Sequence, residues 1–326
     1  MYTFIIDQPG SLIYFESKEI RTPCIIKTLD KDIIETQLKS LGIKDYELIS
    51  PIPKMTILNN SPLFLGCNKD TIDKRDYQFN SILKSSIINS LPQTIDYTNE
   101  MSSVKNQGRL GSCVGFAVAA MKEWQEKKEY LNEIESGIKY RRKSPEYDLS
   151  EMWIYYKSKE IDPWPNQEGT SIRCAIKQVC KLGVPPEKAW VYNDKIKGKP
   201  ERWSPMIAKW KMGDGYFRVN NLNELLNVLN NYGPTVIGIY CFREIFNPGK
   251  SGIVKYPSNK YNCYGGHAIC VTSFHRGSQL VKFKNSWGSN WGNKGYGYLP
   301  FKYIQDFMND AWILIDKNVS HDELKK

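Results

Sequence analysis

The stretch VKNQGRLGSCVGFAVAAMKEW, residues 104–124, runs from a polar loop into an apolar segment. Ser112 is a natural N-cap, so Cys113 is expected in the first turn of a helix. Unpaired backbone N–H groups and the helix dipole make such a position electropositive, which favours a thiolate and lowers the thiol pKa. Apolar residues then recur in steps of three and four, as on one helix face: Phe116, Ala117, Ala120, Met121 and Trp124. Cys113 is therefore either a buried residue that begins a core helix or a nucleophile.

The composition describes a chain able to bury a large core. It has 326 residues, 41% of them hydrophobic, which is enough for one large domain or a domain with a smaller appendage. No window approaches the roughly 18 uninterrupted apolar residues of a spanning helix, and no membrane role is expected. The N-terminus lacks a basic stretch followed by a long apolar run, so we expect a protein that is cytoplasmic or otherwise not secreted through a signal peptide. Abundant Lys, Ile, Asn and Tyr favour an AT-rich genome, such as that of a microbe or a large DNA virus.

Eight cysteines and three histidines limit the metal chemistry. No CxxC pair occurs, and a chain of this size needs no disulfide staples. We therefore expect reduced thiols, no metal and no cofactor.

The net charge of +10 raises the question of a nucleic-acid partner. The basic residues are spread along the chain, and the one dense run, KYRRKS at 139–144, lies in a polar connection. Because no nucleic-acid motif accompanies them, we expect no specific nucleic-acid binding.

Residues 1–66 have the pattern of a small α/β unit. A polar, poorly periodic linker follows at 67–92, the main domain spans 93–316, and 317–326 form a charged tail. Within the first unit, short strands are predicted at 3–7, 11–17, 23–29 and 46–52, and a helix at 30–43.

The main domain changes period along its length. Helices are predicted from Ser112 onward and at 149–161, 171–183 and 224–231, and strands at 234–242, 267–274, 279–285, 295–301 and 311–316. Helices first and strands later predict an α+β fold with two lobes.

Hairpin geometry brings a histidine beside an asparagine. If Phe274 pairs with Gln279 across a turn at 275–278, His267 faces Ser286 to within a residue, and its imidazole lies beside the side chain of Asn285. An amide oxygen can accept the imidazole N–H and hold the ring for proton transfer.

Three stretches together resemble the papain-like cysteine proteases: VKNQGRLGSCVGFA, GGHAICVTSF and KNSWGSNWGNKGYGYLP. The third is the most specific, and the resemblance covers about two-thirds of the chain. It implies the papain-like two-lobed fold, with a helical left lobe and a β-barrel-like right lobe, here with a small N-terminal α/β extension. It also implies a cysteine peptidase that hydrolyses protein or peptide substrates through a thioester intermediate.

The resemblance assigns roles by position. Cys113 corresponds to the nucleophile, His267 to its general base and acid, Asn285 to the residue that orients His267, and Gln107 to the side-chain donor of the oxyanion hole. Substrate contacts are implied at Gly169 and Gly265 along the cleft, at Trp287 over the His267–Asn285 pair, and at Trp291 on the leaving-group side. Val114 and Leu110 depart from the family pattern, which has tryptophan and, in secreted members, cysteine there.

Two questions stay open at this level. Residues 1–92 are either an inhibitory prosegment, with 67–92 laid through or near the cleft and later cut, or a permanent accessory domain. The chain is a peptidase, a catalytically silent binding protein of the same fold, or a thiol-dependent amidase or acyl transferase.

Overall fold

The computed structural model forms two compact units, Met1–Met55 and Thr56–Lys326. The division falls before residue 56 rather than after residue 66, because residues 56–58 pair with the second unit. The residues described are 2–6, 12–15, 18–21, 24–28, 38–39, 46–49, 55–58, 60–70, 73, 75–79, 91–135 and 147–316. The basic run at 139–144 and the tail at 317–326 lie outside them.

The first unit is built from short antiparallel strands. β1 (Tyr2–Ile6) pairs with β4 (Cys24–Thr28) on one side and β5 (Tyr46–Ile49) on the other, while β2 (Leu12–Phe15) pairs with β3 (Lys18–Arg21). Each of the four predicted strands overlaps one of these, the strand predicted at 3–7 being shifted by one residue from β1, and β3 was missed. Of the predicted helix at 30–43, only Leu38 and Lys39 are described, and both are helical.

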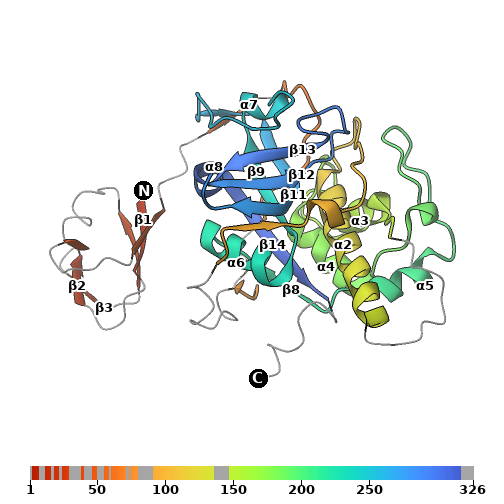
Figure 1. The fold of residues 1–326 in the computed structure, drawn as a ribbon, viewed down its shortest axis with the longest axis horizontal. Coiled ribbons are helices and arrows are strands. Elements are labelled where there is room, and N and C mark those ends of the chain that lie inside the picture. The colour runs from red at the N-terminus through yellow and green to blue at the C-terminus, as the bar shows by residue number, and fades with distance from the viewer. Residues whose placement is uncertain are drawn as a thin grey trace. The chain divides into compact units, whose positions relative to one another are not determined.

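Three helices gather on one side of the main sheet (Figure 1). They are α2 (Cys113–Glu135), α3 (Glu151–Lys159) and α4 (Ile172–Leu182), and they pack on one another. The Ser150 hydroxyl accepts a hydrogen bond from the Trp153 N–H at 3.2 Å, which caps α3 as predicted. Gly183 ends α4 with φ +72°, a conformation that favours glycine.

The start of α2 is buried on every side. Residues 113–126 are all buried, including Lys122 and Glu123, so the single apolar face expected from the periodicity is incomplete. The Ser112 carbonyl accepts the Phe116 N–H at 3.3 Å, as at the start of a helix, and the Ser112 hydroxyl lies 2.7 Å from the Tyr192 hydroxyl. The central position of α2 places Cys113 at the boundary between the helices and the sheet.

The main sheet has the order β13-β12-β11-β9-β14-β8, with β7 also paired to β11. Every pairing within it is antiparallel. Successive residues of β9, β11 and β14 are buried, because α2 and α4 pack on these strands and so do α6 (Leu222–Tyr232) and α8 (Phe301–Phe307). The strand bounds are β7 (Thr94–Asp96), β8 (Gly215–Arg218), β9 (Thr235–Cys241), β11 (Gly265–His275), β12 (Leu280–Lys284), β13 (Tyr296–Pro300) and β14 (Met308–Ile315).

The remaining elements are short. They are β6 (Thr56–Ile57), which pairs in parallel with β10 (Asn262–Cys263), the helices α5 (Ser204–Ala208) and α7 (Arg243–Phe246), and 3-10 turns at Thr98–Glu100, Glu187–Ala189 and Lys209–Lys211. None of the helices described is both long and apolar enough to cross a bilayer.

Candidate active site

Cys113 is the first residue of α2, and its side chain is completely buried. Its Sγ accepts a hydrogen bond from the Ala268 N–H at 3.4 Å, next to His267 on β11. Burial raises the pKa of the Cys113 thiol to about 11, although backbone N–H groups oppose the shift. The predicted lowering of this pKa is therefore wrong for this state, because desolvation outweighs the helix terminus.

His267 and Asn285 meet as the sequence predicted. The His267 Nε2 lies 2.8 Å from Asn285 Oδ1, which also accepts the Ser286 N–H at 2.8 Å. The Trp287 ring stacks on the imidazole, with centroids 4.3 Å apart and planes 22° apart. Burial lowers the pKa of His267 to about 4, and the hydrogen bond to Asn285 opposes this. The imidazole is therefore neutral near pH 7.

The hairpin register that led to this pair differs from the predicted one. His275 pairs with Leu280, so the turn is 276–279 rather than 275–278. A bulge between Val271 and Ser273 then shifts the register again before the strand reaches Cys270, opposite Lys284. The His267 and Asn285 side chains still meet, because the error in the predicted register is smaller than the distance that an imidazole and an amide side chain span.

Gln107 lies in the loop before α2 and contacts both that loop and the residues that follow β12. Its Nε2 donates to the carbonyl oxygens of Phe64, at 3.1 Å, and Leu110, at 3.0 Å. Its Oε1 accepts the Ser286 hydroxyl at 2.6 Å, which fixes the orientation of the amide. Sequence reasoning placed Ser286 in this hairpin but assigned it no role.

Residues 64–68 run across these side chains. The N–H groups of Gly66 and Cys67 both donate to Gly266 O, at 3.2 and 3.1 Å. On the other side, Gly66 O accepts the Thr170 N–H at 3.0 Å, and the Asn68 N–H donates to Thr170 O at 2.9 Å. This segment is thus hydrogen-bonded to both walls of the site, upstream of the residues 67–92 expected there.

The predicted substrate-contacting glycines line the same channel. A Cβ on Gly169, which has φ +84°, would lie 2.5 Å from Gly66 O, and a Cβ on Gly265, with φ +134°, would lie 3.3 Å from Leu65. Trp291 packs edge-on against Trp287, and its Nε1 donates to Ile245 O at 3.1 Å. The glycines therefore lie against residues 65 and 66, Trp287 stacks on the imidazole, and Trp291 packs against Trp287.

One acidic group in the described part of the chain has metal-like spacing: Glu126, Glu129 and Asp316. Buried Lys122 forms ion pairs with both Glu126 and Asp316, and Lys211 also pairs with Glu126. These cations already neutralise the carboxylates, so the arrangement does not require a metal ion.

Comparisons with known proteins agree with this architecture. A family model described as papain family cysteine protease matches residues 91–304. The uncharacterized peptidase C1-like protein L477 of Acanthamoeba polyphaga mimivirus is 28% identical over 265 residues, 75% of this chain and 81% of that one. Mouse cathepsin K is 26% identical over 275 residues, 80% of this chain and 75% of that one.

Solved structures extend the likeness to the fold. Xylellain, a cysteine protease from Xylella fastidiosa, has a TM-score of 0.68 and 27% identity over 80% of this chain and 99% of its own. The helices, the antiparallel sheet and these relatives define a cysteine peptidase that acts on peptide bonds. The chain belongs to the papain family of cysteine proteases.

Proposed function

We propose that this chain hydrolyses peptide bonds through Cys113, His267, Asn285 and Gln107. The observation that carries this proposal is the environment of His267. The His267 Nε2 is hydrogen-bonded to Asn285, whereas Nδ1 has no hydrogen-bond partner among the described residues. The next residue, Ala268, contacts Cys113 Sγ through its backbone N–H. A neutral imidazole held in this way has one basic nitrogen available to accept a proton.

The reaction follows from these positions. The thiol proton of Cys113 moves to Nδ1 of His267, and the sulfur attacks the peptide carbonyl carbon. Gln107 Nε2–H and the Cys113 backbone N–H stabilise the negative oxygen, a contribution of about 3 kcal/mol for one well-placed donor. The imidazolium gives its proton to the leaving amine, which breaks the C–N bond. Water then gives a proton to Nδ1 and attacks the thioester, and the proton returns to the thiol as the acid leaves.

We further propose that the full chain is an inactive precursor in which residues 56–79 block the cleft. Backbone pairing on both sides of residues 66–68 supports this, as does the contact of Gln107 with Phe64 O. The shifted pKa values of Cys113, about 11, and His267, about 4, support it as well. With both groups neutral near pH 7, almost no thiolate is present, so the covered site is expected to react slowly.

The test is to incubate the purified full chain and follow its length together with peptidase activity. We expect the wild type to shorten by cleavage between residues 79 and 93 and to gain activity as it does so. The Cys113→Ala chain is the control, and it should stay intact and inactive. A wild type that never shortens and is fully active at once contradicts the precursor proposal.

One observation favours a second candidate, a silent binding protein of this fold: the Cys113 thiol is completely buried. An epoxide inhibitor that alkylates thiols, combined with a peptide library, separates the possibilities. Labelling at Cys113 with peptide cleavage supports the peptidase. Labelling without peptide cleavage favours an amidase or acyl transferase. If neither labelling nor cleavage occurs, even after residues 1–92 are removed, the binding protein is favoured.

A further inference from the structure

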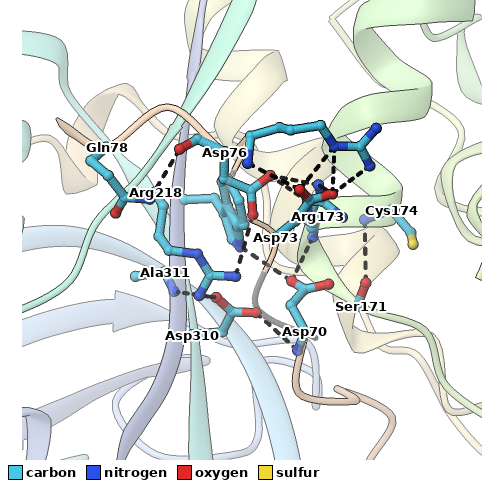
Figure 2. Close-up of polar contacts among 12 residues, drawn as sticks. Asp70, Asp73, Asp76, Gln78, Ser171, Arg173, Cys174, Arg218, Asp310 and Ala311 are labelled. Atoms are coloured by element: carbon cyan, nitrogen blue, oxygen red, sulfur yellow. Dashed lines mark hydrogen bonds and ion pairs between the residues drawn. The ribbon is translucent and has the colours of Figure 1, made fainter.

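Apart from the proposed catalytic residues, a group of charged side chains lies where residues 70–78 meet α4 and β8 (Figure 2). Asp70, Asp73 and Asp76 belong to the segment that we propose to be removed. Their partners, Arg173 at the start of α4 and Arg218 at the end of β8, belong to the part that remains.

Arg173 contacts all three aspartates. Its Nε donates to Asp76 Oδ1 at 2.6 Å and its Nη2 to Asp73 Oδ2 at 2.8 Å. Its backbone N–H, in the first turn of α4, donates to Asp70 Oδ2 at 3.0 Å. Asp73 and Asp76 come together in a turn, closed by the Asp76 N–H donating to Asp73 O at 3.1 Å, so Arg173 binds several carboxylates of one short stretch of chain.

Arg218 is held by residues outside the segment. Its Nη1 donates to Asp310 Oδ1 at 2.9 Å, and its guanidinium lies over the Trp312 ring, 4.5 Å from the centroid. Its Nη2 is 3.9 Å from Asp76 Oδ2, and its backbone N–H donates to Tyr77 O at 2.9 Å. Because Asp310 and Trp312 support the side chain, Arg218 keeps its place when residues 56–79 leave.

Removal of the segment changes the charge balance of this surface. Three carboxylates leave together with the Arg75 guanidinium that pairs with Asp73, whereas the guanidinium groups of Arg173 and Arg218 remain, and of the described carboxylates that stay behind, Asp310 is the one paired with them. We infer that the surface formed by Arg173, Arg218 and the first turn of α4 binds acidic residues of peptide substrates. This inference rests on the proposed function, since it requires both a peptidase and the release of residues 56–79.

The bound segment indicates where these acidic residues lie relative to the reacting bond. Phe64 O is at Gln107, Asn68 pairs with Thr170, and Asp70 reaches α4, so the acidic site begins about six residues from the reacting carbonyl. Trp291, implied on the leaving-group side, is bonded to α7, which Figure 1 places at the opposite end of the second unit from β8. The acidic site therefore lies on the acyl side, which precedes the scissile bond in a substrate.

Three internally quenched peptides with the same cleavable core, chosen from a peptide library, test this inference. The first carries aspartates at every third position, beginning about six residues before the scissile bond. The second carries asparagine at those positions, and the third carries the aspartates after the scissile bond. On the full chain after its own shortening, we expect kcat/KM for the first peptide to exceed that of the other two by about tenfold, and the advantage to shrink with added salt.

Arg173→Gln and Arg218→Gln each should reduce this ratio, Arg173→Gln to near one. Arg202→Gln, at an exposed arginine outside the network, is the matched control and should keep the ratio. Equal rates on all three peptides overturn the inference and leave the proposed function intact.

Failure to cleave any peptide overturns the proposed function instead. Fluorescein-labelled first and second peptides are then titrated into the Cys113→Ala chain carrying Asp73→Asn and Asp76→Asn, which removes two of the negative charges that compete for Arg173 and leaves His267, Asn285 and Gln107 unchanged. Saturable binding of the aspartate peptide alone supports the acidic site. Binding of neither peptide, or of both equally, overturns it.

Discussion

At the residue scale, one hydrogen bond decides the protonation of the site. Asn285 Oδ1 accepts the Ser286 N–H, so the amide oxygen, not its nitrogen, faces His267. A neutral imidazole must then carry its proton on Nε2 and leave Nδ1 basic. Trp287 covers this pair with its ring and excludes water from the hydrogen bond. The base is thus oriented before any substrate arrives.

Gln107 and Ser286 offer a graded test of the oxyanion hole. We expect Gln107→Ala to lower kcat by about 10²- to 10³-fold with little change in KM, because the donor acts mainly in the transition state. Ser286→Ala only frees the amide to rotate, so we expect a loss of about tenfold, the equivalent of one hydrogen bond. Steady-state kinetics of the shortened enzyme measure both, and equal losses would show that Ser286 does more than orient Gln107.

The reactivity of Cys113 should report whether the cleft is covered. With a thiol pKa of about 11, the full chain holds almost no thiolate at pH 7, and the thiolate fraction rises as the pH increases toward 11. We expect iodoacetamide to modify Cys113 slowly at pH 7 and about 100-fold faster after residues 56–79 are released. Mass spectrometry of the labelled peptide measures the rates. Equal rates in the two forms would mean that the segment does not shield the thiol.

At the scale of elements, the segment fits the cleft because glycines line both sides of it. A Cβ on Gly66 would lie 2.0 Å from Gly111 O, and a Cβ on Gly266 would lie 2.0 Å from Cys67 O. Two backbones approach closely only where side chains are missing. The segment at 64–68 therefore fits between its neighbours through its backbone, and hydrogen bonds rather than large side chains hold it.

Gly66→Ala tests this fit. The added methyl cannot coexist with Gly111 O, so we expect looser docking of residues 64–68 and faster labelling of Cys113 in the full chain. Gly215→Ala is the control, because a Cβ there meets nothing within 4 Å. An unchanged labelling rate for Gly66→Ala would show that the segment is anchored elsewhere, for example at Arg173.

Most elements of the main domain were predictable because their signals are local. Ser150, Gly183 and Gly233 mark helix ends, and period-two patterns mark β9, β11, β12, β13 and β14. The register of the β11–β12 hairpin was not predictable, because the bulge after Val271 depends on packing rather than on turn residues. The segment at 56–70 was assigned partly to the first unit and partly to a linker, because its backbone pairs only with partners far along the chain.

The contacts of the segment with β14 and with α4 should respond to pH in opposite directions. Burial and the neighbouring Asp70 raise the pKa of Asp310, so its contribution to docking is fully present below the ordinary carboxyl pKa and is lost as the pH rises through the raised value. Asp73 behaves oppositely. Arg75 and Arg173 lower its pKa, so its contribution is present above the ordinary value and is lost as the pH falls.

Asp310→Asn isolates the first effect. We expect docking of the segment in this variant to weaken less with rising pH than in the wild type, because the amide still accepts from Arg218 but cannot ionise. The ratio of Cys113 labelling rates, wild type over variant, cancels the ionisation of the thiol itself. This ratio should increase between about pH 5 and pH 9. A flat ratio would show that Asp310 does not titrate in this range.

At the scale of the whole molecule, the residues proposed to be catalytic come from two parts of the second unit that are far apart in sequence. Gln107 and Cys113 precede and begin α2, whereas His267 and Asn285 belong to the β11–β12 hairpin. The packing of α2 on β11 and the hydrogen bonds between Gln107 and Ser286 join them, and a single sequence indicates this through motifs rather than through spacing. The residues that cover them, 64–68, belong to the same compact unit.

This division predicts the result of a truncation. Removal of residues 1–55 leaves every described contact of residues 56–79 with the cleft, since those partners all lie within Thr56–Lys326. We expect the chain that begins at Thr56 to keep its melting temperature within about 3 °C of the full chain and to resist labelling at Cys113 equally well. Removal of residues 1–79 should instead give immediate labelling and peptide cleavage. Calorimetry and timed alkylation of the two truncations measure these effects. Rapid labelling after loss of residues 1–55 alone would mean that the first unit, and not the segment at 56–79, maintains the closed cleft.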